Sequence, residues 1–389
     1  MNIRRLTMDD FEQSLSLGQF AFQNELSEEE REQAKKRFVP NDHWGIFDEE
    51  NALMSKLALL PMDVYFHGSP LKACGVSSVS SWPEHRRQGH IRQLLDESLK
   101  DMYERGAALS LLYPFNISFY RNFGWELFCE RTKWQFNQLQ LPKPEQPEHG
   151  RIRRLKQEDW EDLNHVYQAF AAGYSGTLVR DEVWWDQRVQ KSKKGQRAVY
   201  ENETGSPEGY VIFEVKEQEL KVKELVYTTP QAKQALSGFL GQHDSMVEES
   251  EWTVPPNESF RFFLKDPKVT EETKPYFMAR VVNAEKLLKA VPWGSCKQEN
   301  LDLILKDDFA SWNNGIYRLH FKEQTYVEVV EAANDDAIEL DVKALIPILF
   351  SYVTAEELHA AGTLQGSAEI IASLQQAVPK TIPFLYDFF

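Results

Sequence analysis

Residues 79–92 read VSSWPEHRRQGHIR and join the small-residue end of a predicted strand to the start of a predicted helix through a basic loop. Gly89 has no side chain, so the backbone there can curve around an anion and approach it closely. A helix that begins beside Gly89 directs unpaired N–H groups and the positive end of its dipole at the same point. Arg86, Arg87 and Arg92 add positive charge. The stretch therefore predicts a turn that binds a pyrophosphate, although a lone motif of this kind also fits a solvated basic turn before a surface helix.

The residues behind this loop have helical periodicity. Apolar side chains recur at three- and four-residue spacing: Ile91, Leu94, Leu95, Leu99 and Met102. This spacing predicts an amphipathic helix with one face against a sheet. Upstream, residues 75–81 are mostly small and read as a strand, along which an extended ligand could bond to the backbone.

A second informative stretch, residues 107–125, reads AALSLLYPFNISFYRNFGW. It contains a short apolar run, a loop with Pro114, and a brief helical segment that ends at Gly124. This order predicts a strand followed by a short helix that carries Tyr120. Tyr120 is either a core aromatic residue or part of a functional site.

Residues 86–91, RRQGHI, resemble the motif Arg/Gln-x-x-Gly-x-Gly/Ala with which GNAT N-acetyltransferases hold the pyrophosphate of acetyl-CoA. Ile91 stands where the family usually has glycine or alanine. Residues 119–125, FYRNFGW, resemble a companion motif of the same family. The resemblance implies a wedge between two strands for the pantetheine arm, with Tyr120 near the thioester sulfur as the general acid.

The same resemblance implies which residues contact CoA. They are Val79, Ser80, Ser81, Arg87, Gln88, Gly89, His90, Ile91, Arg92, Phe115 and Asn116. Family members differ most at the last two of these positions. The backbone N–H groups of Val79 and its strand neighbours are expected to polarise the acetyl carbonyl.

Composition limits the classes of protein to consider. The 389 residues, 42% of them hydrophobic, are enough for two or three globular domains. The cysteines Cys74, Cys129 and Cys296 lie far apart and lack metal-ligand spacing, so we expect a cytoplasmic protein with neither disulfides nor a metal. The first residues do not form a charged-then-apolar leader, and no apolar run approaches the ~20 residues that span a bilayer, so we expect no membrane segment.

The formal net charge of −16 argues against nucleic acid as a partner. It is compatible with the attraction of a cationic small molecule. Solubility is the simpler explanation of such a charge, so charge alone identifies no substrate.

An internal duplication divides the chain. Residues 141–150, LPKPEQPEHG, contain three prolines and read as a semi-rigid linker. Beyond it, residues 152–160, IRRLKQEDW, repeat residues 3–11, IRRLTMDDF, at an offset of 149. We therefore expect two copies of one domain, with a chance match as the alternative. In the second copy residues 228–236, TTPQAKQAL, replace the basic loop, so we expect this copy to bind no CoA and to shape the acceptor pocket of the first.

A third region follows with a different pattern. Alternating apolar residues predict strands at 301–305, 317–321 and 325–330, and apolar helical runs follow at 341–349 and 355–361. The order resembles a sterol-carrier-protein-like domain. We therefore predict a mixed α/β and α+β fold in three parts: a catalytic GNAT domain at 1–141, a degenerate GNAT-like domain at 151–280, and a sterol-carrier-protein-like domain at 281–389.

The three parts together resemble the Eis (enhanced intracellular survival) family over the whole chain. Family members place their C-terminal carboxylate in the active site of the first domain. Residues 383–389, PFLYDFF, end this chain on aromatic side chains, so the resemblance implies that role for the carboxylate of Phe389. A tail that only packs into the core is the alternative. The resemblance also implies a homo-oligomer, and the family includes hexamers.

The resemblance implies transfer of an acetyl group from acetyl-CoA to an amine of a small cationic acceptor, such as an aminoglycoside, a polyamine or a lysine-like molecule. The amine attacks directly, through a tetrahedral intermediate. An alkylammonium has a pKa of about 10, so a proton must leave before or during the attack. The carboxylate of Phe389 either accepts this proton or positions the ammonium. Two alternatives stay open: a non-catalytic protein that binds a lipid or a partner, and a protein or peptide N-acetyltransferase.

Overall fold

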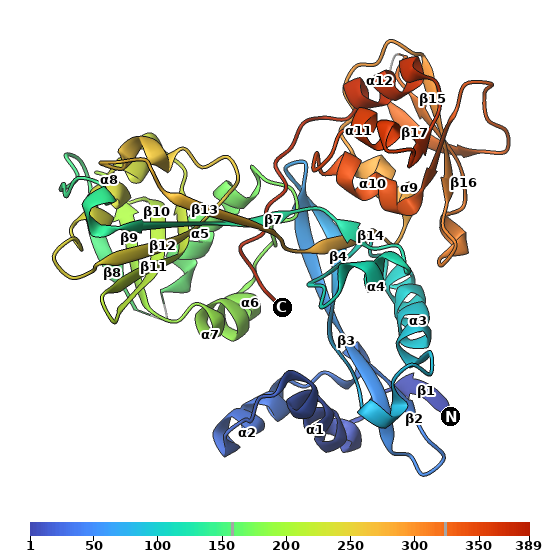
Figure 1. Ribbon diagram of the computed structural model, residues 1–389, viewed down its shortest axis with the longest axis horizontal. Helices are drawn as coiled ribbons and strands as arrows, with labels where there is room; N and C mark the ends of the chain where they lie inside the picture. Colours follow the sequence, from blue (N-terminus) through green and yellow to red (C-terminus); the bar gives the residue numbers. More distant parts are fainter. Residues whose placement is uncertain (157–158, 323–324) are drawn as a thin grey trace.

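The computed structural model describes residues 1–156, 159–322 and 325–389. The described strands form three sheets of seven, seven and five strands, and helices pack against each sheet. Figure 1 shows the third sheet at one end of the molecule and the C-terminal tail running back between the first two. Parallel and antiparallel pairs occur together, which confirms the predicted mixed α/β and α+β fold.

The first sheet has the strand order β1-β2-β3-β4-β5-β14-β6. Its strands are β1 (Asn2–Arg5), β2 (His43–Phe47), β3 (Leu53–Phe66), β4 (Ser69–Ser81), β5 (Leu109–Leu112), β14 (Met278–Val281) and β6 (Glu126–Leu127). The helices of this part are α1 (Phe11–Phe22), α2 (Glu28–Arg37), α3 (His90–Glu104) and α4 (Ile117–Arg121). On α3, Leu94, Leu95, Leu99 and Met102 are fully buried, which confirms the predicted apolar face.

The second sheet has the strand order β13-β7-β12-β11-β10-β9-β8. Its strands are β13 (Thr270–Pro275), β7 (Glu130–Asn137), β12 (Glu249–Val254), β11 (Glu219–Tyr227), β10 (Pro207–Lys216), β9 (Gln196–Glu201) and β8 (Arg151–Leu155). Helices α5 (Trp160–Ala171) and α8 (Pro230–Gly241) pack against it. The short helices α6 (Glu182–Trp184) and α7 (Gln190–Ser192) flank a π-helical turn, Trp185–Val189.

The third sheet has the strand order β17-β16-β15-β18-β19. Its strands are β17 (Tyr326–Val330), β16 (Gly315–His320), β15 (Asn300–Lys306), β18 (Ile338–Asp341) and β19 (Leu364–Gln365). The helices are α9 (Ala284–Ala290), α10 (Val342–Leu349), α11 (Ala355–Ala360) and α12 (Ala368–Ala377). One apolar cluster continues from this sheet into the first, with Leu303 and Leu109 among its members. Of the helices in the described ranges, none is both long and apolar enough to cross a lipid bilayer.

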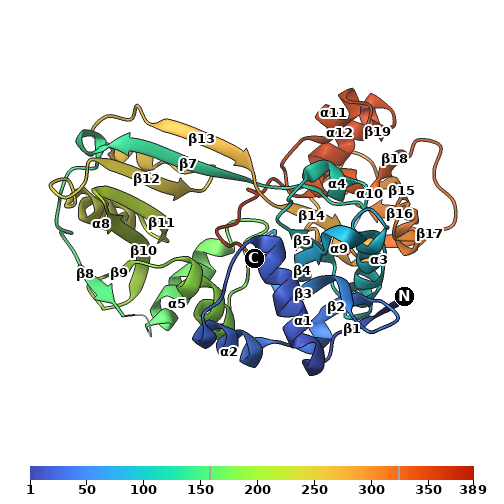
Figure 2. The ribbon, with the colours of Figure 1, turned by 60° about the horizontal axis from the view of Figure 1, so that its bottom comes forward.

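Two strands are exchanged between the first and second sheets. β7 follows β6 in the chain but lies in the second sheet, where Trp134 stands opposite Trp252 of β12. β14 follows β13 in the chain but lies in the first sheet, between β5 and β6. Figure 2 shows β7 and β13 extending from the second sheet toward the first. The domain boundaries read from the sequence stay predictions, and the two sheets take strands from both sides of them.

The C-terminal tail follows α12 and runs back between the first two sheets (Figure 1). The backbone N–H of Ser175 donates to the carbonyl of Ile382 at 2.9 Å, and the N–H of Phe384 donates to the carbonyl of Ser175 at 3.0 Å. Of residues 384–389, all are buried except Phe388, which is 53% exposed. The tail is therefore part of the core between the two sheets.

Candidate functional site

The parallel pair β4 and β5 separates partway along its length. The two strands are paired only from Ala73 opposite Leu109 to Gly75 opposite Leu111, although β4 continues to Ser81. On the β5 side, the rest of β4 therefore has backbone groups that no strand of this sheet pairs, and an extended ligand can use them. We call this opening, formed by β4 residues 75–81 and the end of β5, the first fork.

On its other side β4 has a bulge. The register with β3 shifts between Lys56, which is opposite Ser80, and Ala58, which is opposite Ser77. Ser78 lies in this interval with φ 53°, in the left-handed region that non-glycine residues seldom adopt. Such a bulge redirects the backbone, and here it does so at residues 78–79, where the strand borders the first fork.

The loop after β4 leads into α3 through two residues with positive φ. Arg87 has φ 62°, and Gly89, the N-cap of α3, has φ 82°. No side chain caps this helix, and its first intrahelical bond runs from the N–H of Gln93 to the carbonyl of Gly89 at 3.2 Å. A Cβ on Gly89 would meet no other atom within 4 Å. The N–H groups of residues 90–92 thus have no hydrogen-bond partner among the described residues, as an anion site at a helix N-terminus requires.

Basic side chains surround this helix start. Arg86 and Arg87 are exposed, and in the described part of the chain neither guanidinium is paired with a carboxylate. The Nε of Arg86 donates to the carbonyl of Ser81 at 3.4 Å. The guanidinium of Arg92 lies 5.4 Å from the ring centroid of Phe309. The positive charge beside the open helix N-terminus is therefore not neutralised by acidic neighbours.

Some of the residues predicted to contact CoA use their side chains for hydrogen bonds within the protein. The buried ring of His90 lies with Nδ1 3.0 Å from the Oγ of Ser55, which donates to the Oγ of Ser81 at 2.7 Å. Burial lowers the pKa of His90, so the ring favours its neutral form. The Nε2 of Gln88 donates to the carbonyl of Glu84 at 3.0 Å. His90 and Ser81 can therefore meet a phosphate through their backbone N–H groups rather than through their side chains.

The remaining predicted contact residues lie on both sides of the first fork. Val79 packs beside the core under α3, and Ile91 packs beside the same core. The Oγ of Ser80 donates to the carbonyl of Ser78 at 3.1 Å. Asn116 caps α4, since its Oδ1 accepts from the N–H of Phe119 at 2.9 Å. Phe115 is 71% exposed.

Tyr120 lies on α4 and its side chain is buried. Its ring packs against the rings of Phe115, Phe119 and Trp125 at centroid distances of 5.4, 5.2 and 6.2 Å. Among the described residues no group forms a hydrogen bond with its hydroxyl. Burial raises the pKa of Tyr120 above its usual value. The hydroxyl is thus protonated at neutral pH and available to donate a proton to a ligand.

The last residue of the chain packs into the first fork. A Cβ on Gly75 would lie 2.6 Å from Cε2 of the Phe389 ring, so only glycine leaves room for this contact. The ring also packs against Phe277 and Trp184, at centroid distances of 4.8 and 5.8 Å. The structure therefore brings the C-terminal residue to the point where β4 and β5 separate.

Tyr120 and Phe389 lie on opposite faces of the first sheet. Side chains alternate between the faces of a strand. Cys74 and Val76 of β4 share an apolar cluster with Tyr120. The intervening Gly75 faces the ring of Phe389. A group held in the first fork would therefore have Tyr120 on one side and the C-terminal residue on the other.

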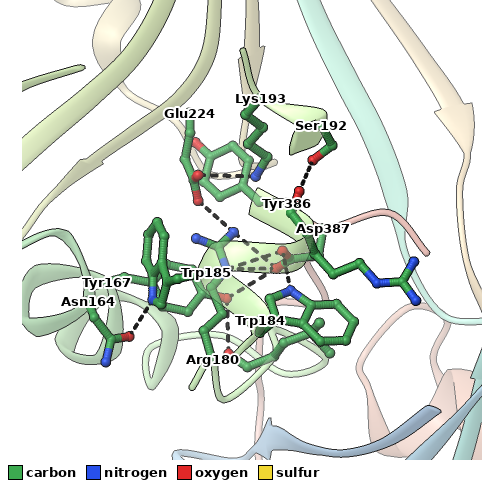
Figure 3. A network of polar contacts seen from close by, with 12 residues as sticks. Asn164, Tyr167, Arg180, Trp184, Trp185, Ser192, Lys193, Glu224, Tyr386 and Asp387 are labelled. Carbon is green, nitrogen blue, oxygen red and sulfur yellow. Dashed lines mark hydrogen bonds and ion pairs between the residues drawn. The ribbon is translucent and has the colours of Figure 1, made fainter. Parts of the chain in front are cut away.

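A buried ion network holds the tail in this position. Asp387 accepts from the Nε of Arg180 at 3.1 Å and from the indole N–H of Trp184 at 3.0 Å. The Nη2 of Arg180 donates both to Asp387 at 3.0 Å and to Glu224 at 2.8 Å, and Glu224 accepts from the Nζ of Lys193 at 3.1 Å. Figure 3 shows these groups around the central guanidinium. Two cations thus balance two carboxylates, as buried charges require.

Electrostatics and backbone contacts fix the network further. Burial alone would raise the pKa of Asp387, but Arg180 and Lys193 outweigh it and hold the pKa below its usual value. The Tyr276 hydroxyl donates to the backbone carbonyl of Asp387 at 2.8 Å. The Tyr386 hydroxyl donates to the carbonyl of Leu225 at 3.0 Å. The end of the chain is therefore held at two consecutive residues, Tyr386 and Asp387.

This network has no recognisable pattern in the sequence. Arg180 and Asp387 are separated by 207 positions, so no local pattern connects them. The one signal was Asp387 itself, the only charged residue in the apolar and aromatic stretch 383–389, because a buried carboxylate needs a cationic partner.

Three protein-family models match separate parts of the chain. A family model described as an acetyltransferase (GNAT) domain matches residues 2–128, and a second model with the same description matches residues 176–281. A model described as a sterol carrier protein domain matches residues 284–386.

Relatives and solved structures match long stretches of the chain. An uncharacterized N-acetyltransferase of Streptomyces avermitilis is 24% identical over 98% of this chain and 96% of its own. The N-acetyltransferase Eis of Mycobacterium tuberculosis is 26% identical over 57% of this chain and 58% of its own. A probable N-acyltransferase of Enterococcus faecalis, a solved structure, is 28% identical with a TM-score of 0.92, covering 100% of this chain and 99% of its own. Eis1 of Mycobacterium abscessus, at 19% identity, a TM-score of 0.84 and complete coverage of both chains, shares the fold.

Proposed function

Because this chain belongs to the Eis-like GNAT N-acetyltransferases, we propose that it moves the acetyl group of acetyl-CoA directly to an amine of a small cationic acceptor, of the aminoglycoside, polyamine or lysine-like kind. The two predicted GNAT domains and the sterol-carrier-protein-like domain are confirmed by the three matches. The chain is therefore an acetyl-CoA-dependent acyltransferase by family.

The first fork fits acetyl-CoA by its shape and charge. The uncapped start of α3, open at Gly89, offers N–H groups to the pyrophosphate, and Arg87 adds a guanidinium that has no acidic partner among the described residues. The unpaired edge of β4 offers backbone groups to the pantetheine arm. The cofactor supplies an activated thioester carbonyl. These features support the eleven CoA contacts inferred from the family motif.

Tyr120 is the proposed general acid. Its hydroxyl is buried, is protonated at neutral pH, and forms no hydrogen bond with the described residues. Such a hydroxyl can give a proton to the departing sulfur. On the other side of the reacting centre, the backbone N–H of Val79, beside the bulge in β4, is the proposed donor to the carbonyl oxygen.

The C-terminal carboxylate is the proposed partner of the amine. The ring of Phe389 lies on Gly75, on the face of the sheet opposite Tyr120. An amine that enters from this face would meet the carboxylate before it meets the thioester. The carboxylate then accepts the proton or holds the ammonium until water removes it. The predicted homo-oligomer stays a prediction.

The observation that carries the proposal is the first fork, with an open anion site at one end and Tyr120 and Phe389 on its two faces. Release of free thiol from acetyl-CoA, measured with polyamine, aminoglycoside and lysine acceptors, tests it. We expect acceptor-dependent release, and about tenfold weaker CoA binding in Arg87→Gln, because a charge-assisted contact is lost. Arg121→Gln is the control, since Arg121 is paired with Glu126 outside the loop.

Several results would contradict the proposal. The absence of thiol release across the whole amine panel would favour a protein that binds a lipid or a partner instead. Activity confined to lysine peptides would favour a protein N-acetyltransferase. Equal CoA affinities of Arg87→Gln and Arg121→Gln would remove the basic loop from the site.

A further inference from the structure

The second sheet has a fork at the place that matches the first. β11 and β12 are parallel and paired from Glu219 opposite Glu249 to Val222 opposite Trp252, and both strands continue beyond that pair. The 149-residue offset of the duplication places Val222 on Ala73, in the paired segment before the first fork. We call this opening, next to Val222 and Trp252, the second fork.

A cavity of about 260 Å³ lies at the second fork. Its wall contains four basic side chains, Arg131, Lys193, Lys221 and Lys223, and one acidic side chain, Glu251. The chain as a whole has a formal net charge of −16. A predominantly basic cavity in so acidic a protein is a site for an anion rather than for a polycation.

Most of the charges in this wall already have partners. Each of the three lysines pairs with a carboxylate outside the cavity wall, at 2.7–3.1 Å. Glu251 pairs with Lys133 at 2.8 Å. Arg131 differs, because among the described residues no carboxylate lies within ion-pair distance of it, and its guanidinium is 5.4 Å from the ring centroid of Tyr276. Arg131 therefore supplies the uncompensated positive charge of the cavity.

The cavity adjoins the first fork through the C-terminal tail. Tyr386 and Phe388 contribute to its wall. The next residue, Phe389, packs on Gly75 in the first fork. Consecutive Cα atoms are about 3.8 Å apart, so one residue of the tail connects the cavity wall to the proposed amine site.

We propose that this cavity binds an oxyanion group, a carboxylate or a phosphate, of the acceptor whose amine enters the first fork, with Arg131 as the principal ligand. A guanidinium forms two parallel hydrogen bonds with such a group. The proposal rests on the proposed acetyl transfer and narrows its acceptor to amines that also have an anionic group, of which lysine is a simple example. A polyamine has no anionic group for Arg131 and is repelled by its uncompensated positive charge.

Matched acceptors test the proposal by binding alone. Nα-acetyl-lysine and its amide share the same side-chain amine and differ in the carboxylate, while O-phosphoethanolamine and ethanolamine differ in the phosphate. In calorimetric titrations of the full chain saturated with CoA, which fills the first anion site, we expect the anionic member of at least one pair to bind at least about tenfold more tightly. The pair that shows the preference identifies the oxyanion.

Two variants locate the effect. Arg131→Gln is expected to abolish the preference, whereas Lys274→Gln, on β13 directly opposite Arg131 but outside the cavity, is expected to keep it. Equal affinities within both pairs, or a preference that survives Arg131→Gln, would overturn the proposal. A protein that binds the anionic acceptors in this way but transfers no acetyl group would overturn the proposed function and leave the site standing.

Discussion

The first fork, between β4 and β5, and the second fork, between β11 and β12, lie at matching places in two sheets, yet different groups enter them. At the first, Gly75 leaves room for the ring of Phe389. At the second, the residue at the same 149-residue offset is Glu224, which binds Arg180 and Lys193. The duplicated fold thus provides an opening in each copy, and the side chains at its edge decide what the opening holds.

The helices that follow the two forks, α3 and α8, differ in how their N-terminal N–H groups are satisfied. α3 begins at Gly89 and no side chain satisfies its first N–H groups. α8 begins with Pro230, which has no N–H, and the side chain of its N-cap Thr229 accepts from the N–H of Ala232 at 3.1 Å. The second helix therefore satisfies part of its own N-terminus, while the first leaves its N-terminus to an anion. This contrast supports the prediction that only the first copy binds CoA.

Tyr120, the proposed proton donor, lies beside the first fork only, and its removal is expected to have the largest effect on kcat. Tyr120→Phe is expected to lower kcat by about 10²–10⁴ without a change in CoA affinity, because a general acid acts only in the transition state. Steady-state kinetics with calorimetry of CoA binding measure both quantities. Tyr103→Phe on α3, an exposed tyrosine on the far part of the helix, is the control. An unchanged kcat in Tyr120→Phe would remove this residue from the mechanism.

The ion network behind the second fork is expected to act on stability. Asp387→Asn leaves Arg180 and Lys193 with Glu224 alone, and breaking a buried pair in this way typically costs about 3–5 kcal/mol of the free energy of unfolding. Urea unfolding monitored by fluorescence measures this cost. Glu285→Gln, in the exposed pair with Lys289, should change the free energy by less than about 0.5 kcal/mol. Similar small changes in both variants would mean that the network does not hold the tail.

Residues added after Phe389 test whether kcat depends on the position of the C-terminal carboxylate. Residues added after Phe389 displace the carboxylate from the first fork, and misplacement of a reacting group by about 1 Å can cost about 10²-fold in rate. We expect a loss of kcat on this scale with CoA binding unchanged. The same residues added before Met1, which is 63% exposed, should have no effect on kcat. Full activity of the C-terminally extended protein would refute the role of the carboxylate.

A buried lysine lies beside each fork, Lys56 at the first and Lys193 at the second. The smallest expected effect is that of Lys56 on the pH dependence of the free energy of unfolding. Lys56 lies opposite Ser80 at the bulge, and its Nζ donates to the Oγ of Ser14 at 2.9 Å with no carboxylate partner in the described ranges, whereas Lys193 has Glu224. Burial lowers the pKa of Lys56 to about 8 from its usual 10.5. Above about pH 8 the unfolded chain therefore binds more protons than the folded one, so the free energy of unfolding rises with pH through this window.

The effect of Lys56 is measured as a difference between two proteins. Between pH 8 and pH 9.5 its contribution rises by about 1–2 kcal/mol, and Lys56→Met should lack this rise. Urea unfolding of both proteins at pH 7, 8 and 9.5 gives the difference, which should change much less between pH 7 and pH 8 than between pH 8 and pH 9.5. Parallel profiles across the whole range would show that Lys56 is not buried in its charged form.

The parts of the first copy that depend on local pattern could be predicted from the sequence. Three such parts are the basic loop, the apolar face of α3 and the short helix with Tyr120. Each is formed by residues close together in the sequence, so glycine, charge and periodicity predict its structure. The second copy could be predicted from the internal repeat, because residues 152–160 still match residues 3–11. The contacts of each predicted residue with CoA stay predictions.

The parts that depend on distant pairing could not be predicted. β7 alternates apolar and polar residues whichever sheet it joins, and β14 has only four residues, all buried. Their exchange is therefore decided by partners more than 100 positions away, such as Trp252 opposite Trp134. The same holds for Asp387 and Arg180, 207 positions apart. The position of the C-terminal residue depends on both features.

A crystal structure of the full chain with bound acetyl-CoA would show whether the first fork is the cofactor site. We expect the pyrophosphate to lie within hydrogen-bond distance of the N–H groups of residues 90–92 and of Arg87, with the thioester in the first fork between Tyr120 and the carboxylate of Phe389. Acetyl-CoA bound instead at the start of α8, or an empty first fork at saturating concentration, would contradict it.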